Sequence, residues 1–360
     1  MIKNKMGNQT LTFSRKPVIL SAASVVGKKE GEGPLSQWFD TTLEDDTFGE
    51  KTWEKSESKM LKTAMTEALR KSGRSKEDIG AMLSGDLLNQ LMSSSFMARD
   101  MHIPFLGMYG ACSTMTESLM LGAVLTDGQY SDNVIIGASS HYCTAERQFR
   151  MPLEHGNQRP PCAQWTATAA GAMVLSSSKD KDAKMITDEE GNTKTPSPVC
   201  VDCGTIGKVI DAGIKDANQM GAAMAPAAVD TLLNHFSDTG RDIDYYDLIL
   251  TGDLGYIGKD IAKDLLVDAG LSQKSVDSRY DDCGAMIFIK EQDVHGGGSG
   301  CGCSASVFSS YVYKRMQKEE LRKVLIISTG ALLSTISPFQ GESIPGIAHA
   351  IALETGQEGH

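Results

Sequence analysis

The chain has 360 residues, of which 46 are acidic and 35 are Lys or Arg, so its formal net charge is −11. This charge and the lack of an extended basic cluster argue against nucleic acid and against anionic lipid as direct partners. No run approaches the ~20 apolar residues that a membrane-spanning helix needs. A chain of this length exceeds one ordinary core, which favours two domains or a duplicated unit.

The N-terminus is polar and lacks the hydrophobic segment of a signal peptide. The eight cysteines are scattered along the chain, which favours reduced thiols over a disulfide framework. Cys200 and Cys203 have the spacing of two zinc ligands, but the sequence has no second CxxC or Cys/His pair at the separation typical of a zinc site. We therefore expect no metal site.

In chain order, apolar runs and helical periodicity alternate through the first half. The pattern predicts a buried strand over 17–26, a loop with short helical insertions over 28–52, and a helix over 56–71. A strand at 78–87 and a helix at 91–99 follow. Further strands are predicted at 133–140 and 167–175, before a polar turn at 176–182.

The segment 107–121 predicts a cysteine at the start of a helix. Gly110 and Ala111 let the backbone bend before Cys112. Thr114 and Glu117 have the spacing of a capping box. A thiol at a helix N-terminus faces unpaired N–H groups, which should lower its pKa and suit an acyl acceptor or an anion pocket. The alternative interpretation is a buried structural cysteine.

The second half repeats the order of the first. Ser72-Gly73-Arg74 and the motif at 84–87 have counterparts in Thr239-Gly240-Arg241 and the motif at 251–254. Gly110-Ala111-Cys112-Ser113 is echoed by Gly302-Cys303-Ser304-Ala305. The sequence thus predicts two diverged α/β units, residues 1–180 with Cys112 and residues 181–360 with the Gly-rich loop 296–303. In such units, two helix N-termini can converge on one pocket.

A helix-borne cysteine, a duplicated α/β unit and a late Gly-rich element resemble the thiolase and ketoacyl-synthase superfamily over nearly the whole chain. More closely, five motifs resemble the stage V sporulation protein AD family; they lie at 83–90, 110–114, 164–172, 250–255 and 299–305. The resemblance implies a thiolase-like fold with layers in the order α/β/α/β/α.

By resemblance, the family belongs to the machinery that moves dipicolinic acid (pyridine-2,6-dicarboxylate) into the developing spore. It is expected to bind dipicolinate and to lie at the spore inner membrane through partner proteins of a channel complex. Relatives in the superfamily also imply a homodimer.

Condensing enzymes of the ketoacyl-synthase III type pair their cysteine with a His and an Asn. Here the corresponding loop 251–255 has no His, and Cys301 falls at or near the Asn position. Asp253 beside a thiolate would oppose the chemistry through like-charge repulsion. We therefore expect a binding protein without catalytic residues. The alternatives are an acyl-CoA condensing enzyme that uses Cys112 and a structural docking subunit.

The expected ligand site lies around Cys112, with N–H groups of two helix N-termini offsetting the ligand charge. Its predicted members come from two sets: Cys112, Gly252, Asp253, Cys301, Cys303 and Ser304 at the relict active site, and His141, His155, Gln164, Trp165 and Thr166 as walls. Free dipicolinate and its calcium chelate both remain open as the ligand. No other cofactor is expected.

Overall fold

The computed structural model describes residues 4–149, 159–177, 186–187, 193–194 and 196–355. Ten strands follow one another in a mixed sheet in the order β14-β13-β16-β17-β12-β3-β9-β7-β5-β6. The first half contributes β3 (Val18–Val26), β5 (Ala81–Gly85), β6 (Phe105–Gly107), β7 (Asn133–Ser140) and β9 (Ala169–Ser176). The second half contributes β12 (Val199–Thr205), β13 (Leu248–Thr251), β14 (Tyr280–Asp282), β16 (Lys323–Ala331) and β17 (Gly346–Thr355).

The two sets of strands share one topology. They meet where β3 and β12 pair antiparallel, with Ile19 opposite Val199. Outward from this junction, each half continues with two antiparallel pairings and then two parallel ones, through β9, β7, β5 and β6 on one side and β17, β16, β13 and β14 on the other. This repetition confirms the predicted duplication, while the boundary at residue 180 stays a prediction.

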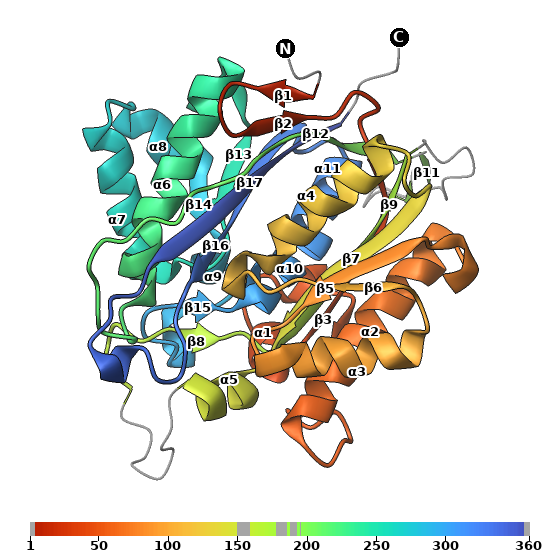
Figure 1. Ribbon diagram of the computed structural model, residues 1–360, viewed down its shortest axis with the longest axis horizontal. Coiled ribbons are helices and arrows are strands. Elements are labelled where there is room, and N and C mark those ends of the chain that lie inside the picture. The colour runs from red at the N-terminus through yellow and green to blue at the C-terminus, as the bar shows by residue number, and fades with distance from the viewer. Residues whose placement is uncertain (1–3, 150–158, 178–185, 188–192, 195, 356–360) are drawn as a thin grey trace.

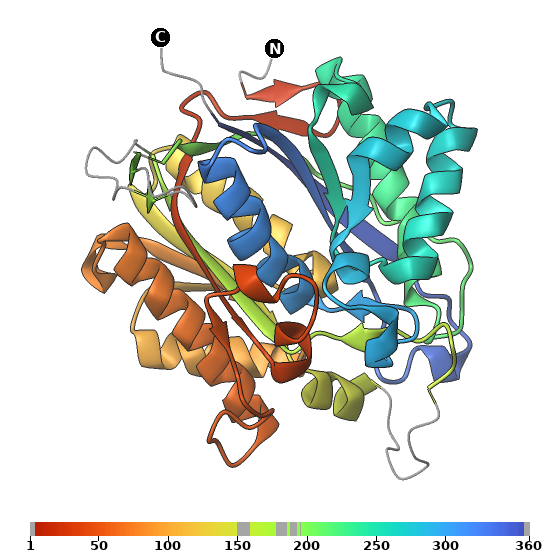
Figure 2. The same ribbon diagram turned by 180° about the vertical axis from the view of Figure 1, so that it is seen from behind.

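Helices lie outside and between the two halves of the sheet (Figures 1 and 2). The outer layers contain α2 (Trp53–Ser72) and α3 (Met92–Met101) on one side, and α6 (Met220–Thr239) and α7 (Gly255–Asp268) on the other. Between the halves lie α4 (Thr114–Asp127), α10 (Cys301–Val307) and α11 (Tyr313–Gln317). Helix α4 packs against β7, β16 and β17, and α10 against β3, β7 and β9. The fold is therefore the predicted layered α/β/α/β/α structure.

The motif that repeats in sequence also repeats in structure. Helices α2 and α6 end at Ser72 and Thr239, and each is followed by a glycine in the left-handed region: Gly73 at φ 70° and Gly240 at φ 67°. Glycine adopts this conformation without the steric cost that a Cβ brings, so it ends each helix cleanly. A single 3₁₀ turn then leads into β5 and β13, respectively.

The remaining elements are short. The predicted loop 28–52 contains α1 (Lys28–Gly31) and β4 (Thr41–Thr42). The other helices are α5 (Tyr142–Phe149), α8 (Gln273–Arg279) and α9 (Cys283–Met286). The other strands are β1 (Lys5–Met6), β2 (Thr10–Thr12), β8 (Trp165–Thr166), β10 (Ile186–Thr187), β11 (Thr193–Lys194) and β15 (Gly298–Ser299). None of the helices in the described part of the chain combines the length and hydrophobicity needed to cross a membrane.

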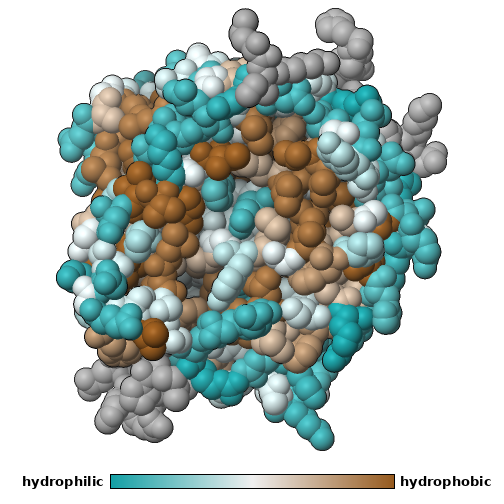
Figure 3. Space-filling view, in the orientation of Figure 1, coloured by the Kyte–Doolittle hydropathy of each residue, from teal (hydrophilic) through white to brown (hydrophobic). Residues whose placement is uncertain are grey.

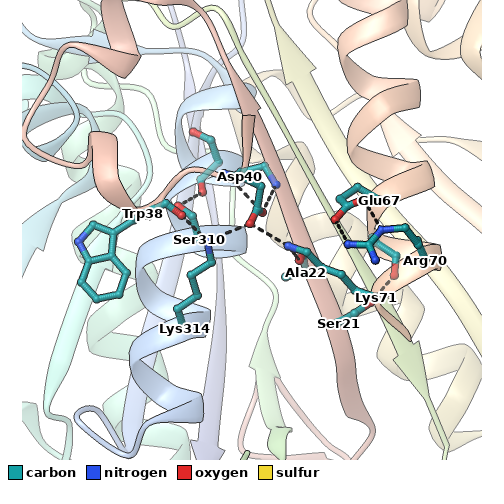
Figure 4. A network of polar contacts seen from close by, with 12 residues as sticks. Ser21, Ala22, Trp38, Asp40, Glu67, Arg70, Lys71, Ser310 and Lys314 are labelled. Atoms are coloured by element: carbon teal, nitrogen blue, oxygen red, sulfur yellow. Dashed lines mark hydrogen bonds and ion pairs between the residues drawn. The ribbon is translucent and has the colours of Figure 1, made fainter. Parts of the chain in front are cut away.

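A half-buried ion network links α11 of the second half to the first half of the chain (Figure 4). Asp40 lies between Lys71 of α2 and Lys314 of α11, whose ammonium nitrogens lie 2.8 and 2.9 Å from its Oδ1. Burial alone would raise the pKa of Asp40, but the two lysines outweigh it and lower the pKa. The Lys314 ammonium also donates to the carbonyl of Trp38.

Candidate functional site at the junction of the two halves

Cys112 lies in a 3₁₀ turn, Ala111–Ser113, that leads directly into α4. The bend before it is made by Ala111, whose φ of 51° is in the left-handed region. Such a backbone is strained for a residue with a Cβ, and strain of this kind is concentrated at functional sites. Gly110 leaves room beside it for the Glu117 side chain, because a Cβ there would lie 2.3 Å from Oε2 of Glu117.

The predicted capping box does not form. The hydroxyl of Thr114 donates to the carbonyl of Ala111 over 2.7 Å, and it accepts from the N–H of Gly110. The carboxyl group of Glu117 lies beside Gly110, but its buried Oε2 has no hydrogen-bond partner among the described residues. The tight turn at Ala111 makes local hydrogen bonds that take the place of the expected cap.

Asp253 is buried beside Cys112 and is held by donors from three segments. Its Oδ1 accepts from the Thr329 hydroxyl over 2.6 Å, and its Oδ2 accepts from the Gly300 N–H over 2.9 Å. The Ser299 hydroxyl lies 3.3 Å from Oδ2. The carboxyl group also neighbours the Cys112 thiol closely enough to raise its pKa. Thus the predicted meeting of loops 251–255 and 296–303 at Cys112 occurs.

These surroundings overturn the expectation of an acidic thiol. Burial raises the pKa of Cys112 well above its usual range, and the neighbouring Asp253 and Cys301 raise it further. Burial also raises the pKa of Asp253, although its hydrogen bonds oppose that effect. The helix N-terminus is too weak to offset the loss of solvation, so Cys112 is a protonated thiol near neutral pH.

The backbone N–H groups at the start of α10 already donate hydrogen bonds to other groups of the protein. The N–H groups of Gly300, Gly302 and Cys303 bond to Asp253, to the Ser140 hydroxyl and to the carbonyl of Gly300. The Cys301 thiol donates to the carbonyl of Ser139 over 2.9 Å. The expectation that this helix N-terminus offers N–H groups to a ligand is therefore wrong for these three groups.

A cavity of about 390 Å³ opens in front of Cys112, between the two halves of the fold. The first half lines it with Leu87, Asn89, Tyr109, Ala111, Cys112, Ala145, Phe149 and Thr166. The second half lines it with Ala217, Met220, Ser299, Ala331, Leu332, Leu333 and Ser334. Within the described part of the chain, the lining contains hydroxyl, amide and apolar side chains and no Lys, Arg, His, Asp or Glu.

The structure separates the predicted site residues into different locations. Cys112 and Thr166 line the cavity, whereas Asp253, Cys301, Cys303 and Ser304 are fully buried behind it. Gly252 packs against the backbone of Ser328. Gln164 is also buried, and its amide nitrogen donates to the carbonyls of Asp253 and Gly298 over 2.7 and 2.8 Å.

Two predicted wall residues face elsewhere. His141 is buried: its Nδ1 accepts from the Cys143 N–H, and its Nε2 lies 2.7 Å from the carbonyl oxygen of Asp46. Burial lowers the pKa of His141, which fits this neutral tautomer. Trp165 stacks on Tyr142 outside the cavity. His155 lies outside the described residues.

Strand β8 explains why adjacent residues have different surroundings. It pairs with β15 in parallel, with Trp165 opposite Gly298 and Thr166 opposite Ser299. Side chains alternate between the faces of a strand, so Thr166 and Ser299 face the cavity while Trp165 faces away. Sequence reasoning missed the lining residues at 217–220 and 331–334, because no motif marks them and only the folded chain brings them to Cys112.

Comparison with solved structures shows the class of protein that this fold defines, the thiolase-like condensing-enzyme fold. The 3-oxoacyl-[acyl-carrier-protein] synthase III of Aquifex aeolicus VF5 matches with a TM-score of 0.55 and 11% identity, covering 94% of this chain and 99% of that one. A variant of OleA from Xanthomonas campestris matches with a TM-score of 0.58 and 12% identity, covering 95% and 99%. At such identities the likeness concerns the fold alone.

Sequence comparison then narrows the class to one family. The family model for stage V sporulation protein AD (SpoVAD) matches residues 7–354. The stage V sporulation protein AD of Bacillus subtilis (strain 168) is 42% identical over 348 residues, which cover 97% of each chain. The chain belongs to the stage V sporulation protein AD family, and its role is in sporulation.

Proposed function

We propose that this protein binds dipicolinate, without catalysis, in the cavity beside Cys112. The observation that carries the proposal is a small cavity, whose described lining is uncharged, at a relict condensing-enzyme cysteine. Its volume of about 390 Å³ lies at the lower end of the range of small-molecule sites, which suits a ligand with one aromatic ring. Apolar side chains such as Leu87 and Phe149 can contact the ring, while Asn89, Thr166 and Ser299 offer polar groups.

The surroundings of Cys112 support binding over acyl transfer. A condensing enzyme needs a reactive thiolate and donors that stabilise an oxyanion. Here the neighbouring Asp253 raises the pKa of the thiol, and the described lining provides no histidine to accept its proton. A carboxylate beside a developing oxyanion would raise the barrier to the reaction.

The charge of the lining favours the calcium chelate as the bound form. Dipicolinate carries two negative charges, and burying them without a cation nearby would be costly. The described lining contains no Lys or Arg, and the N–H groups at the start of α10 are already bonded. A one-to-one chelate with Ca²⁺ has no net charge, so it avoids this cost.

Calorimetric titration tests this proposal. We expect saturable binding of dipicolinate that tightens when Ca²⁺ is present, and no binding of isophthalate, which lacks the ring nitrogen. Cys112→Phe should abolish binding by filling the cavity, and Cys112→Ala should weaken it only modestly. Absence of heat and of a thermal shift at millimolar ligand, with and without Ca²⁺, would instead favour a docking subunit.

We also propose that the protein acts as a homodimer held at the spore inner membrane by partner proteins. Strand β6 is an edge of the sheet among the described strands, and Leu106 and Tyr109 nearby are 47% and 54% exposed. The face seen in Figure 1 also exposes hydrophobic surface on both sides of its centre (Figure 3). A second copy would cover such an edge. Sedimentation velocity should show a dimer for the wild type and a monomer for Leu106→Asp.

A further inference from the structure

The connection between β16 and β17 is an Ω-loop that borders the cavity beside Cys112. It lies at the end of these strands that is away from both chain termini (Figure 1). Its ends meet in a neck, where the N–H of Leu332 donates to the carbonyl of Pro345 over 2.8 Å. Residues 332–334 line the cavity. A compact loop with joined ends can move as one unit, and loops of this kind are frequently functional.

The tip of this loop forms its hydrogen bonds within itself. The N–H of Ser334 donates to the Ser337 hydroxyl, and the N–H of Ser337 donates to the Ser334 hydroxyl, each over 3.0 Å. The N–H groups at 340–342 donate to carbonyls at 336–338. Within the described part of the chain, no hydrogen bond or ion pair joins residues 334–342 to the rest of the protein. The tip is therefore an ordered unit that can turn without breaking polar contacts to the sheet.

The same tip holds two large apolar side chains in water. Ile336 is 59% exposed, and Phe339, at 85%, is the most exposed large apolar residue in the part of the chain that the structure describes. An aromatic ring is stabilised when it leaves water. Two such side chains together at the wall of a largely apolar cavity indicate a surface that becomes covered in another state.

Phe339 can reach the cavity without any change in β16 or β17. Ser334 lines the cavity and is bonded to Ser337, and Phe339 follows two residues later, at most about 7 Å further along the chain. Gly341 comes next but one, with a φ of 82°. A Cβ at Gly341 would meet nothing within 4 Å, so this glycine serves the backbone conformation and not packing. It gives the loop a hinge on the side of β17.

We propose that the loop 333–344 is a lid and that Phe339 contacts the ligand in the cavity beside Cys112. In the closed state the Phe339 ring covers the open side of the ligand, and Leu87 and Phe149 contact it from the first half of the fold. Closure removes the ring and the ligand from water together. Because this contact exists only in the closed state, the ligand favours that state. The inference rests on the proposed function, since dipicolinate is the ligand that closes the lid.

Calorimetric titration with dipicolinate and Ca²⁺ tests the contact. Phe339→Ser removes the ring, and we expect binding to weaken about tenfold or more. Tyr130→Ser is the matched control: Tyr130 is an aromatic residue that is 81% exposed, but it lies beyond the C-terminal end of α4, whereas Cys112 lies before the N-terminal end. It should bind as the wild type does. Both positions are exposed, so neither change should affect folding, and melting temperatures check this.

Tryptophan fluorescence tests the closure itself. In Phe339→Trp, the emission should shift to shorter wavelength when dipicolinate and Ca²⁺ are added, because the indole ring leaves water. Tyr130→Trp should show no shift. Difference spectra against the wild type remove the contribution of Trp38, Trp53 and Trp165.

The outcomes separate the lid from the proposed function. Wild-type affinity in Phe339→Ser, or an unshifted emission in Phe339→Trp with ligand bound, would overturn the lid while the binding of dipicolinate stands. Equal losses of affinity in Phe339→Ser and Tyr130→Ser would also overturn the lid. Absence of binding to the wild type would overturn the proposed function and the lid together.

Discussion

The carboxyl group of Asp253 neighbours the thiol of Cys112 in the buried wall between the two halves of the fold, and it raises the pKa of that thiol. The cysteine comes from the turn before α4, and the aspartate comes from the loop after β13. This contact puts an acid where a condensing enzyme needs a group that accepts a proton or stabilises an oxyanion. It is the strongest structural argument for binding over catalysis.

The contact predicts a slow reaction of Cys112 with alkylating reagents. Asp253→Asn removes the negative charge that raises the pKa of the thiol, so alkylation by iodoacetamide should become faster, by about threefold for each unit by which the pKa falls, because a less basic thiolate is also a weaker nucleophile. Peptide mass spectrometry measures the rate at Cys112 itself. Ser299→Ala removes a neighbouring hydroxyl without a charge and should leave the rate unchanged. An equal rate in Asp253→Asn and wild type would contradict the electrostatic explanation.

Cys112 should not become acylated. Incubation with acetyl-CoA or malonyl-CoA is expected to add no acyl mass to the Cys112 peptide, because burial and Asp253 raise the pKa of the thiol and keep it protonated. A stable acyl adduct on Cys112 would contradict this prediction and support the alternative of an acyl-CoA condensing enzyme.

Adjacent residues of β8 should have different effects on ligand binding in the cavity beside Cys112. Thr166→Leu is expected to weaken dipicolinate binding at least tenfold, since it places extra bulk in the first cavity. Trp165→Phe should leave dipicolinate binding within about twofold of wild type, since Trp165 faces the other side of the strand. The two titrations use the same ligand with Ca²⁺. Equal losses in both variants would contradict the assignment of Thr166, and not Trp165, to the cavity.

The ion network at Asp40 should stabilise the packing of α11 against the first half (Figure 4). Asp40→Asn leaves Lys71 and Lys314 without their shared carboxylate and should lower the free energy of unfolding by about 1–3 kcal/mol in urea titrations. Because the folded pKa of Asp40 is lowered, this stability is present above its unfolded pKa and is lost as the pH falls through the folded pKa. Glu67→Gln breaks the more exposed Glu67–Arg70 pair and should cost less than about 0.5 kcal/mol.

Glu30 should make the protein less stable as the pH rises to neutrality. It is buried, and burial raises its pKa to about 7. The folded state therefore binds a proton that the unfolded state has released between about pH 4.5 and pH 7, so stability falls over this range. Glu30→Gln keeps an acceptor for the Thr168 N–H and should remove a dependence on the order of 2–3 kcal/mol from urea unfolding curves. Glu32→Gln, at an exposed position, is the control and should keep the wild-type slope.

The amino-acid pattern predicted most of the secondary structure and the duplication. The apolar run at 133–140 corresponds to β7, and the two Ser/Thr-Gly-Arg motifs correspond to two matching helix ends. Burial periodicity and glycine conformations are local properties, so they can be read along the chain. The meeting of Cys112 with Asp253 and Cys301 followed from the family resemblance, because the chain order of these loops alone does not show that they meet.

The acidity of Cys112 and the extent of the cavity depended on tertiary structure. Sequence position placed the thiol at a helix start and predicted a lowered pKa, but the sign of the shift is decided by burial and by a carboxyl group 141 positions away in the chain. The cavity walls at 217–220 and 331–334 combine segments that share no motif. Local sequence determines which elements form; solvation and long-range charge act only once the elements have packed, and they determine what the site can do.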